Sequence, residues 1–352
     1  MKDIAGDLGI SVMTVSRALR NEPDINPATR AGVLQRATEL NYLPNLAARA
    51  LVTGRTGLMG LVIPNLAHSF FAQLAMELSG ALRMNGFSLF ISSSEEDPEL
   101  EQREIDNLLA RNVDALLIAS TQRSPETFRR LAERKVPYVL LDRWFPELAT
   151  NFVGVNDEAV GVMATEHLIE IGCRHIAHIH GTHTLSEMGR LKGYKQALSR
   201  HGLPVNPEDI VDAAAPGRSA YEAGYRAALA VINLRPRPTG IFCCNDPIAI
   251  GAMAAILDAG IRIPEDIAVI GCGNLPYNSS LRVSLSSVDQ RSGAIGQRAA
   301  QLAVRLVHED VRTRPRAILL APSLVVRRST RRQNESADTS AERAEITRSR
   351  WQ

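Results

Sequence analysis

At 352 residues the chain is long enough for two or three domains with substantial apolar cores. Apolar residues make up 45% and charged residues 22% of the chain, as in globular α/β proteins, and no run of about 18 uncharged apolar residues predicts a membrane span. The formal net charge of +2 excludes a strongly basic or acidic protein, and the first residues lack the apolar core of a signal peptide, so we expect a cytosolic protein.

Three short helices are expected at the start of the chain. Apolar residues at helical spacing predict the first over residues 2–8 and the second over 12–19. Between them, Gly9 favours a left-handed turn, and Ser11 is suited to cap the second helix. An Asn-Pro pair at 26–27 begins the third helix, which we expect to end at Asn41.

A small-residue segment over 45–57 follows and is expected to form a hinge helix and a linker between a head (1–44) and a core (58–326). A hinge helix of only six to eight residues does not offset the cost of helix nucleation, so it should be only weakly helical alone. Positive charge gathers at the two ends of the chain: residues 1–56 carry seven Lys/Arg against five Asp/Glu, and residues 327–352 carry seven against four. This distribution gives weak support for a nucleic-acid contact.

The core is predicted to alternate strands with helices in two series, which indicates two doubly wound lobes with a ligand cleft between them. We expect lobe 1 to span about 58–155 and 288–312, lobe 2 to span about 156–287 and 313–326, and the polar tail 327–352 to be disordered. The expected strands are 58–63, 88–92, 115–119 and 138–141, then 152–155, 175–180, 210–212, 240–243 and 268–270, with helices near 70–85, 98–111 and 124–135.

The first two helices have the pattern of a helix-turn-helix, in which the second helix enters the major groove of DNA. Ala5 is small where the two helices would cross, and Val15 is placed to pack behind the second helix. Thr14, Ser16 and Arg17 lie on its outward side. The pattern therefore predicts a DNA-binding head.

Several motifs stand at the mutual spacing of one known family. They are Asp3-Ile4-Ala5, Gly9-Ile10-Ser11, Thr14-Val15-Ser16-Arg17, Tyr42-x-Pro44-Asn45-x-x-Ala48-Arg49-x-Leu51 and Leu324-Val325-x-Arg327-x-Ser329-Thr330. On these residues the sequence resembles the lactose-repressor (LacI/GalR) family from residue 2 to about Thr330. The resemblance implies a helix-turn-helix head, a bilobal periplasmic-binding-protein-like core of two parallel sheets, and a homodimer on a pseudo-palindromic operator.

The resemblance also implies which residues contact DNA. Val12 and Met13 occupy the two base-reading positions, where apolar side chains contact thymine methyls but make no bidentate hydrogen bonds. Arg17 is the candidate for a guanine contact, with a phosphate contact as its alternative, and a packing role is the alternative for Val12 and Met13. The other expected contacts are Thr14, Ser16 and Asn21 to phosphates, Asn45, and Leu51, either as a wedge in the minor groove or as a helix-packing leucine.

The sequence departs from the family at its start. The family usually has a Thr or Ser two residues before the position of Lys2, where it caps the first helix. Here Met1 precedes Lys2, so either the start codon lies upstream or the first helix frays.

The effector site is predicted from single residues. Arg190 matches an arginine that holds the effector in many family members, and Asn245 follows a strand and begins a helix, where a cleft residue belongs. Gly273 replaces an acidic residue common in the family, which favours an acidic ligand such as a sugar acid over a neutral sugar. Lobe packing or helix capping is the alternative for the side chains of Phe70, Phe71, Asp142, Arg190 and Asn245, and Gly273 completes the expected set.

No catalytic, metal or cofactor site is predicted. The histidines 175, 178, 180 and 183 are close in sequence, but on a strand His175 points away from His178 and His180, and no carboxylate completes a metal shell. There is no nucleophile elbow and no Gly-rich phosphate loop. The cysteines have no C-x-x-C spacing, so we expect buried free thiols at Cys173, Cys243, Cys244 and Cys272.

Three functions compete at this point. The first is a repressor whose cleft ligand alters the lobes and hence operator binding, with a corepressor-dependent regulator as its variant. The second is a solute-binding module of transport type, which the DNA-binding head disfavours. The third is an enzyme, which lacks a reactive constellation. The absence of a leucine heptad after Thr330 makes a homodimer the default assembly.

Overall fold

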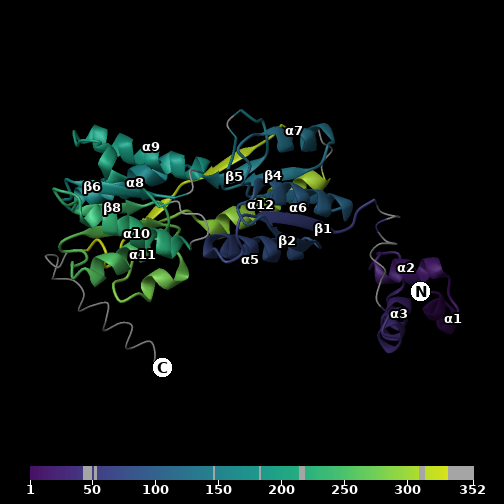
Figure 1. Ribbon diagram of the computed structural model, residues 1–352. Helices are drawn as coiled ribbons and strands as arrows, with labels where there is room; N and C mark the ends of the chain where they lie inside the picture. Colours follow the sequence, from purple (N-terminus) through teal and green to yellow (C-terminus); the bar gives the residue numbers. More distant parts are fainter. Residues whose placement is uncertain are drawn as a thin grey trace, which may run out of the picture. The chain divides into compact units, whose positions relative to one another are not determined.

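The computed structural model describes residues 1–42, 50, 54–145, 147–181, 184–213, 219–308 and 314–331. It divides the chain into two units, Met1–Thr56, which contains the expected head, and Gly57–Gln352, which contains the expected core (Figure 1). Most of the expected hinge, including Asn45 and Leu51, lies outside the described residues. None of the helices in the described ranges has the length and apolar content needed to cross a bilayer.

The described part of the head confirms the three expected helices: α1 (Lys2–Leu8), α2 (Val12–Leu19) and α3 (Pro27–Glu39). The last ends two residues earlier than expected, and Asn41 beyond it has the left-handed φ of 47°. Each helix buries two small or branched side chains, and together these form a compact core. That core consists of Ile4, Ala5, Val15, Ala18, Val33 and Ala37.

The turns of the head follow from its capping residues. Gly9 ends α1 in the left-handed conformation with φ 62°, and Ser11 caps α2 by accepting a hydrogen bond from the Thr14 N–H at 3.0 Å. Asn26 caps α3 through the N–H of Ala28 at 2.8 Å. Met1 precedes α1 without a side-chain cap, yet the helix begins at Lys2.

Lobe 1 is a parallel sheet between two layers of helices, as expected for doubly wound units. The strand order is β11-β5-β4-β3-β1-β2. Apolar side chains of α5 and α12 cover one face of this sheet, and those of α6 and α7 cover the other. The strands are β1 (Leu58–Ile63), β2 (Ser88–Ser93), β3 (Ala115–Ile118), β4 (Tyr138–Leu141), β5 (Phe152–Val155) and β11 (Ala317–Leu320), and the helices are α5 (Ser69–Met84), α6 (Pro98–Ala110), α7 (Glu126–Glu133) and α12 (Ser292–His308).

Lobe 2 repeats this arrangement with the strand order β12-β10-β9-β8-β6-β7. All its strand pairs are parallel except β10 with β12. Helices α8 and α9 cover one face and α10 and α11 the other. The strands are β6 (Ile176–His180), β7 (Ile210–Asp212), β8 (Gly240–Cys243), β9 (Ala268–Cys272), β10 (Ser286–Asp289) and β12 (Ser323–Val325), the helices are α8 (Asp157–Glu170), α9 (Leu185–Arg200), α10 (Ala220–Ile232) and α11 (Asp246–Asp258), and the 3₁₀ turns are η1 (Pro207–Asp209) and η2 (Pro276–Ser279).

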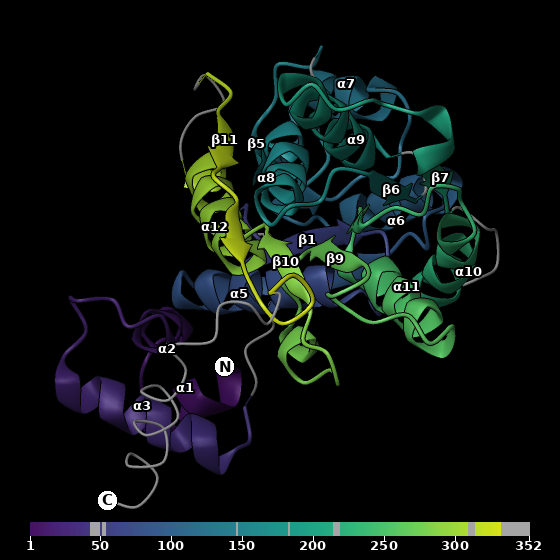
Figure 2. The same cartoon turned by 90° about the vertical axis from the view of Figure 1, so that its left-hand side faces the viewer.

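The expected lobe boundaries need two corrections near the C-terminus. The boundary at 288 falls inside β10, which belongs wholly to lobe 2, and β11 belongs to lobe 1 rather than to lobe 2. The reason is parallel pairing of β11 with β5, in which Ala317 lies opposite Phe152 and Leu320 opposite Val155. The chain therefore passes between the lobes after β5, after β10 and between β11 and β12, and Figure 2 shows the last of these passages in yellow.

The start of the expected disordered tail is ordered, because residues 327–331 are held against lobe 2. The Ser329 hydroxyl accepts a hydrogen bond from the Ser286 N–H at 2.8 Å and donates to the carbonyl of Val269 at 2.6 Å. Thr330 is buried, and its hydroxyl lies 2.8 Å from Nε2 of His167. Buried backbone and hydroxyl groups need such partners, so this segment completes the lobe. Residues 332–352 lie outside the described residues.

Candidate DNA-binding face and ligand cavity

The outward face of α2 begins with two exposed apolar side chains. Val12 is 42% exposed and Met13 is 66% exposed. Neither belongs to the apolar core of the head, so a packing role gains no support. Apolar side chains in this position are suited to contact thymine methyl groups.

The small polar residues of this face are partly engaged with one another. The hydroxyls of Ser11 and Thr14 lie 2.9 Å apart, in addition to the capping bond. Ser16 is half-buried, and its carbonyl accepts a hydrogen bond from Nε of Arg20 at 3.3 Å. Asn21 follows α2 with a left-handed φ of 59°. The phosphate contacts of Thr14, Ser16 and Asn21 stay a prediction.

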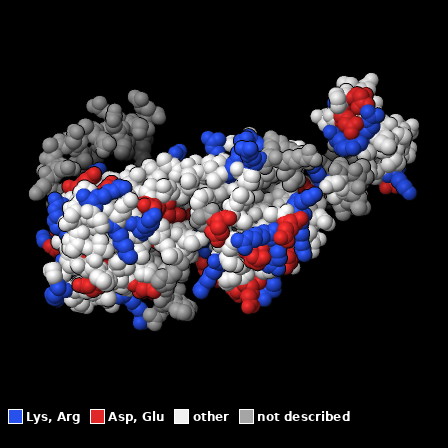
Figure 3. Space-filling model, turned by 90° about the horizontal axis from the view of Figure 1, so that it is seen from above, with Lys and Arg blue, Asp and Glu red and all other residues white. Residues whose placement is uncertain are grey.

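Arg17 is held by two carboxylates that the sequence reasoning missed. Its Nε donates to Glu22 at 2.8 Å, and its Nη2 pairs with Asp24. The hydrogen bond to Glu22 and the charge of Asp24 raise the pKa of Arg17. Both acidic residues come from the turn after α2, five and seven residues further along, so helical spacing gave no signal for the pairs. Figure 3 shows acidic and basic atoms in direct contact in the head, at the right of the view.

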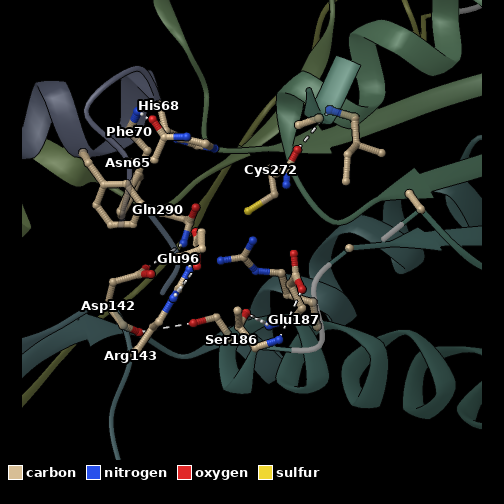
Figure 4. A pocket seen from close by; sticks show the side chains of 18 of the residues that line it. Asn65, His68, Phe70, Glu96, Asp142, Arg143, Ser186, Glu187, Cys272 and Gln290 are labelled. Carbon is tan, nitrogen blue, oxygen red and sulfur yellow. Dashed lines mark hydrogen bonds and ion pairs between the residues drawn. The ribbon is translucent and has the colours of Figure 1, made fainter. Parts of the chain in front are cut away.

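A cavity of about 230 Å³ lies between the two lobes of the core (Figure 4). It is smaller than the roughly 300–1,000 Å³ typical of small-molecule pockets, and so is suited to a small ligand. Of the predicted effector residues, it is lined by Phe70, Phe71, Asp142, Arg190 and Asn245, whereas Gly273 is not among the lining residues and its neighbour Cys272 is.

Strand ends explain why these residues meet. The carboxyl ends of parallel strands share one edge of a sheet, and the side chains that follow them face the crevice outside that edge. Applied to every strand, this rule would also have found four polar lining residues that single-residue reasoning missed. Those residues are Asn65 after β1, Glu96 after β2, Arg143 after β4 and Gln290 after β10.

Arg190, on α9, is buried, and two acceptors hold its guanidinium in place. Its Nε donates to Asp157 at 2.9 Å, and its Nη1 donates to the carbonyl of Cys244 at 2.7 Å. Burial raises the pKa of Asp157 to about 7, against the opposing charge of Arg190. A second guanidinium, Arg143, is paired with Glu96 through two contacts of 3.2 Å. Both cationic side chains of the cavity thus have carboxylate partners before any ligand enters.

Asn245 has both of the roles considered for it. It caps α11 by accepting a hydrogen bond from the N–H of Ile248 at 3.0 Å, and it also lines the cavity. Its neighbour Asp246 is buried and accepts from Ser287, from Asn278 and from the N–H of Leu275 at 2.7–3.0 Å.

Gly273 lies beside that buried carboxylate. It has a φ of 129°, which L side chains rarely adopt, and a Cβ there would lie 3.2 Å from Oδ2 of Asp246. These two constraints account for glycine at this position.

One wall of the cavity is aromatic. Phe70 and Phe71 pack edge-to-face with ring centroids 5.1 Å apart, and both are buried. His68 caps α5 because its Nδ1 accepts a hydrogen bond from the Phe70 N–H at 3.3 Å. Burial lowers the pKa of His68, so the neutral ring that this cap requires is favoured.

Asp142 links the two lobes at the base of the cavity. It follows β4 with a left-handed φ of 59°, and its carbonyl accepts a hydrogen bond from the hydroxyl of Ser186, on α9, at 3.4 Å. Its carboxylate accepts from Nε2 of Gln290, between β10 and α12, at 3.4 Å. These two long contacts join the lobes weakly, and Figure 4 shows Asp142 and Ser186 close to each other.

Two of the histidines singled out in the sequence, His175 and His178, have structural partners. His175 lies 2.7 Å from Asp209, and Nδ1 of His178 donates to the carbonyl of Phe242 at 3.0 Å. Within the described residues no group of three or more His, Cys, Asp or Glu is placed to hold a metal, and His183 lies outside them. The expectation for the cysteines is confirmed, because all four are buried and free.

Two family models match the chain. Residues 1–45 match "Bacterial regulatory proteins, lacI family", and residues 165–330 match "Periplasmic binding protein-like domain". Among curated proteins, catabolite control protein A of Priestia megaterium is 30% identical over 310 residues, covering 88% of this chain and 92% of that protein. The ribose operon repressor of Haemophilus influenzae is 31% identical over 333 residues, covering 94% and 98%.

Two solved structures are also similar to this chain over most of its length. The lac repressor dimer bound to operator and the anti-inducer ONPF has a TM-score of 0.83 at 26% identity, covering 93% of this chain and 98% of that one. The transcriptional regulator CelR in complex with cellobiose has a TM-score of 0.70 at 28% identity, with the same coverage.

Proposed function

The chain belongs to the lacI family of bacterial regulatory proteins, and we propose that it represses transcription as a homodimer on a pseudo-palindromic operator, under the control of a small ligand in the interlobe cavity. The observation that carries this proposal is the convergence of polar and aromatic side chains from both lobes on one small cavity, in a chain that also has a helix-turn-helix head. A transport receptor has no use for such a head. We propose a cytosolic location, where the DNA is, and no catalytic activity.

In the head, we propose that Val12 and Met13 contact bases, that Arg17 reads a guanine, and that Thr14, Ser16 and Asn21 contact phosphates. The exposure of the first two side chains and the capped, outward-facing α2 support this assignment. The proposed contacts of Asn45 and of the wedge Leu51 rest on the family motif alone.

For the cavity, we propose a neutral polyhydroxylated ligand such as a sugar, in preference to the sugar acid that Arg190 and Gly273 suggested. Arg190 already pairs with Asp157 and Arg143 with Glu96, so neither offers an unpaired charge to an anion. Asp142 and Glu187 add further carboxylates to the lining. These oxygens are suited to accept hydrogen bonds from hydroxyl groups and repel a ligand carboxylate.

DNA binding by the full-length protein tests the first part of the proposal. We expect selection from random duplexes to recover a pseudo-palindromic site, and fluorescence anisotropy at a stated salt concentration to give at least 1,000-fold tighter binding to it than to a scrambled duplex, on the order of magnitude usual for specific regulators. Equal affinity for both duplexes would contradict the proposal.

Ligand titration tests the second part. A bound ligand raises the unfolding temperature of the core, by the equivalent of about 2.7 kcal/mol at 100 times its Kd. We expect a neutral sugar to give such a shift and the matching aldonate to give none, and the sugar to change operator affinity in the same samples. A shift with the aldonate alone would show that the cavity selects acids, and the direction of the change in operator affinity separates an inducer from a corepressor.

A further inference from the structure

The two carboxylates on Arg17 belong to a small charge network on the recognition face. One carboxylate oxygen of Glu22 accepts a hydrogen bond from Nε of Arg17 at 2.8 Å. The other oxygen lies 3.1 Å from Nη2 of Arg20. Asp24 forms an ion pair with Nη2 of Arg17. Two positive and two negative side chains therefore meet beside α2, and their formal charges cancel.

The turn that carries these carboxylates is tied to the helices on both sides of it. The Glu22 N–H donates to the carbonyl of Arg17 at 3.2 Å. The Glu22 carbonyl accepts Nη2 of Arg30, on α3, at 2.5 Å. An isolated exposed ion pair contributes little, but a network on a fixed backbone loses less entropy when it forms.

This geometry divides the donors of Arg17. Nε and one N–H of Nη2 point to the carboxylates, and among the described residues no acceptor contacts Nη1. Nη1 therefore stays available for a base, since arginine pairs with O6 and N7 of guanine through two of its N–H groups. A phosphate contact is sequence-independent and needs only an accessible positive charge, which Glu22 and Asp24 offset.

We propose that Glu22 and Asp24 are specificity-determining positioning residues: they orient the Arg17 fork toward a base edge and prevent Arg17 from acting as a mobile phosphate contact. The proposal rests on the assignment of Arg17 as a base reader. It predicts that the carboxylates lower the affinity for non-specific DNA more than the affinity for the operator.

The test compares full-length wild type with Glu22→Gln/Asp24→Asn on the selected operator and on a scrambled duplex of the same length. We expect the double variant to bind the scrambled duplex about tenfold more tightly at 0.1 M salt, roughly the effect of one added phosphate contact. On that duplex, the slope of the logarithm of its binding constant against the logarithm of the salt concentration should steepen by about one. The ratio of its affinity for the operator to its affinity for the scrambled duplex should fall about tenfold.

The chain provides a matched control. Arg36 is also paired with two carboxylates, Asp7 at 2.7 Å and Glu39 at 2.8 Å, on α1 and α3 rather than on the recognition helix. Asp7→Asn/Glu39→Gln removes the same charge and releases an arginine, and should leave the affinity ratio within about twofold of wild type. In an Arg17→Ala background, Glu22→Gln/Asp24→Asn should cause no further loss of the ratio, because the carboxylates act through Arg17.

Each outcome decides the question. An unchanged ratio in Glu22→Gln/Asp24→Asn, an equal loss in the control, or a further loss in the Arg17→Ala background overturns the inference. If the double variant lost its helical circular dichroism, Asp24→Asn alone, at the exposed end of the network, should still lower the ratio, and an unchanged ratio there would also overturn it. Failure of the wild type to distinguish the two duplexes would instead refute the proposed function itself.

Discussion

The head and the core each present an arginine to a candidate ligand, and each arginine is held by a carboxylate, but the surroundings differ. The side chain of Arg17 is 40% exposed, whereas that of Arg190 is 7% exposed. In the head, water and salt screen the ion pairs, so these pairs contribute little to the stability of the fold. In the core, removing one partner leaves the other charged and buried. The same pair of residue types therefore tunes binding in one region and maintains the fold in the other.

The largest effect expected from this contrast is on the stability of the core. Arg190→Ala leaves Asp157 without its partner and removes a hydrogen bond to the carbonyl of Cys244, so the free energy of unfolding should fall by about 3–5 kcal/mol at pH 8. Urea denaturation followed by circular dichroism measures it. As a control, Arg262→Ala removes an exposed pair with Asp266 and should leave the midpoint unchanged. An equal loss in both variants would remove the distinction between buried and exposed pairs.

A second effect concerns acid stability in the core. Burial lowers the pKa of His178 to about 3 from its ordinary 6.5, so as pH falls the unfolded chain takes up the proton first. The contribution to stability is complete above pH 6.5 and should be lost by about 1.4 kcal/mol per pH unit below it. His178→Phe keeps a ring between Tyr194 and Phe242, and should flatten the dependence of the free energy of unfolding on pH below 6.5. Parallel curves for variant and wild type between pH 6.5 and 5 would show that His178 does not titrate on unfolding.

A smaller effect is expected at the cap of the recognition helix. Ser11→Ala removes the acceptor of the Thr14 N–H and should cost the head about 1 kcal/mol, the usual value for an N-cap serine. Hydrogen exchange of the head amides in the full-length protein measures this loss, and the amides of β8 in the core serve as the internal control. Equal changes in both regions would mean that the cap supports more than the head.

The smallest effect on stability is expected at Arg17, and it tests the comparison with Arg190 most directly. Arg17→Ala should leave the unfolding midpoint unchanged, because its pairs are exposed, while operator affinity falls about 10- to 100-fold through loss of a base contact. Thermal melts and anisotropy on the same preparation test both expectations. A lowered midpoint would place Arg17 with Arg190 as a structural arginine.

The sequence predicted the helices of the head more fully than the lining of the cavity, for a physical reason. The recognition face lies within one short helix, so local spacing orders Val12, Met13 and Arg17 on one side of it. The cavity collects residues from Asn65 to Gln290, which are brought together only by the order of strands in two sheets. Single residues such as Arg190 and Asp142 were found, but their partners Asp157 and Ser186 lie on other elements and gave no local signal.

The strands near the C-terminus were the part of the fold that the sequence did not reveal. Strands β10, β11 and β12 have three or four residues each, and β10 reads Ser-Ser-Val-Asp, with little apolar periodicity. Their places follow from pairing with β5 and β9, which is a tertiary effect. The ordered segment at 327–331 was missed for the same reason, because its polar side chains are satisfied by distant hydrogen bonds.

The late position of these strands has a consequence for synthesis on the ribosome. The head is complete once residue 42 has emerged, whereas lobe 1 awaits β11 and lobe 2 awaits β12 and Ser329. At about 5–20 residues per second, these last pieces follow the head by roughly 15–60 s. A nascent chain thus presents a folded DNA-reading surface before the lobes that are to regulate it can close. Because the dimer also forms late, weak binding by a lone head would limit premature occupation of the operator.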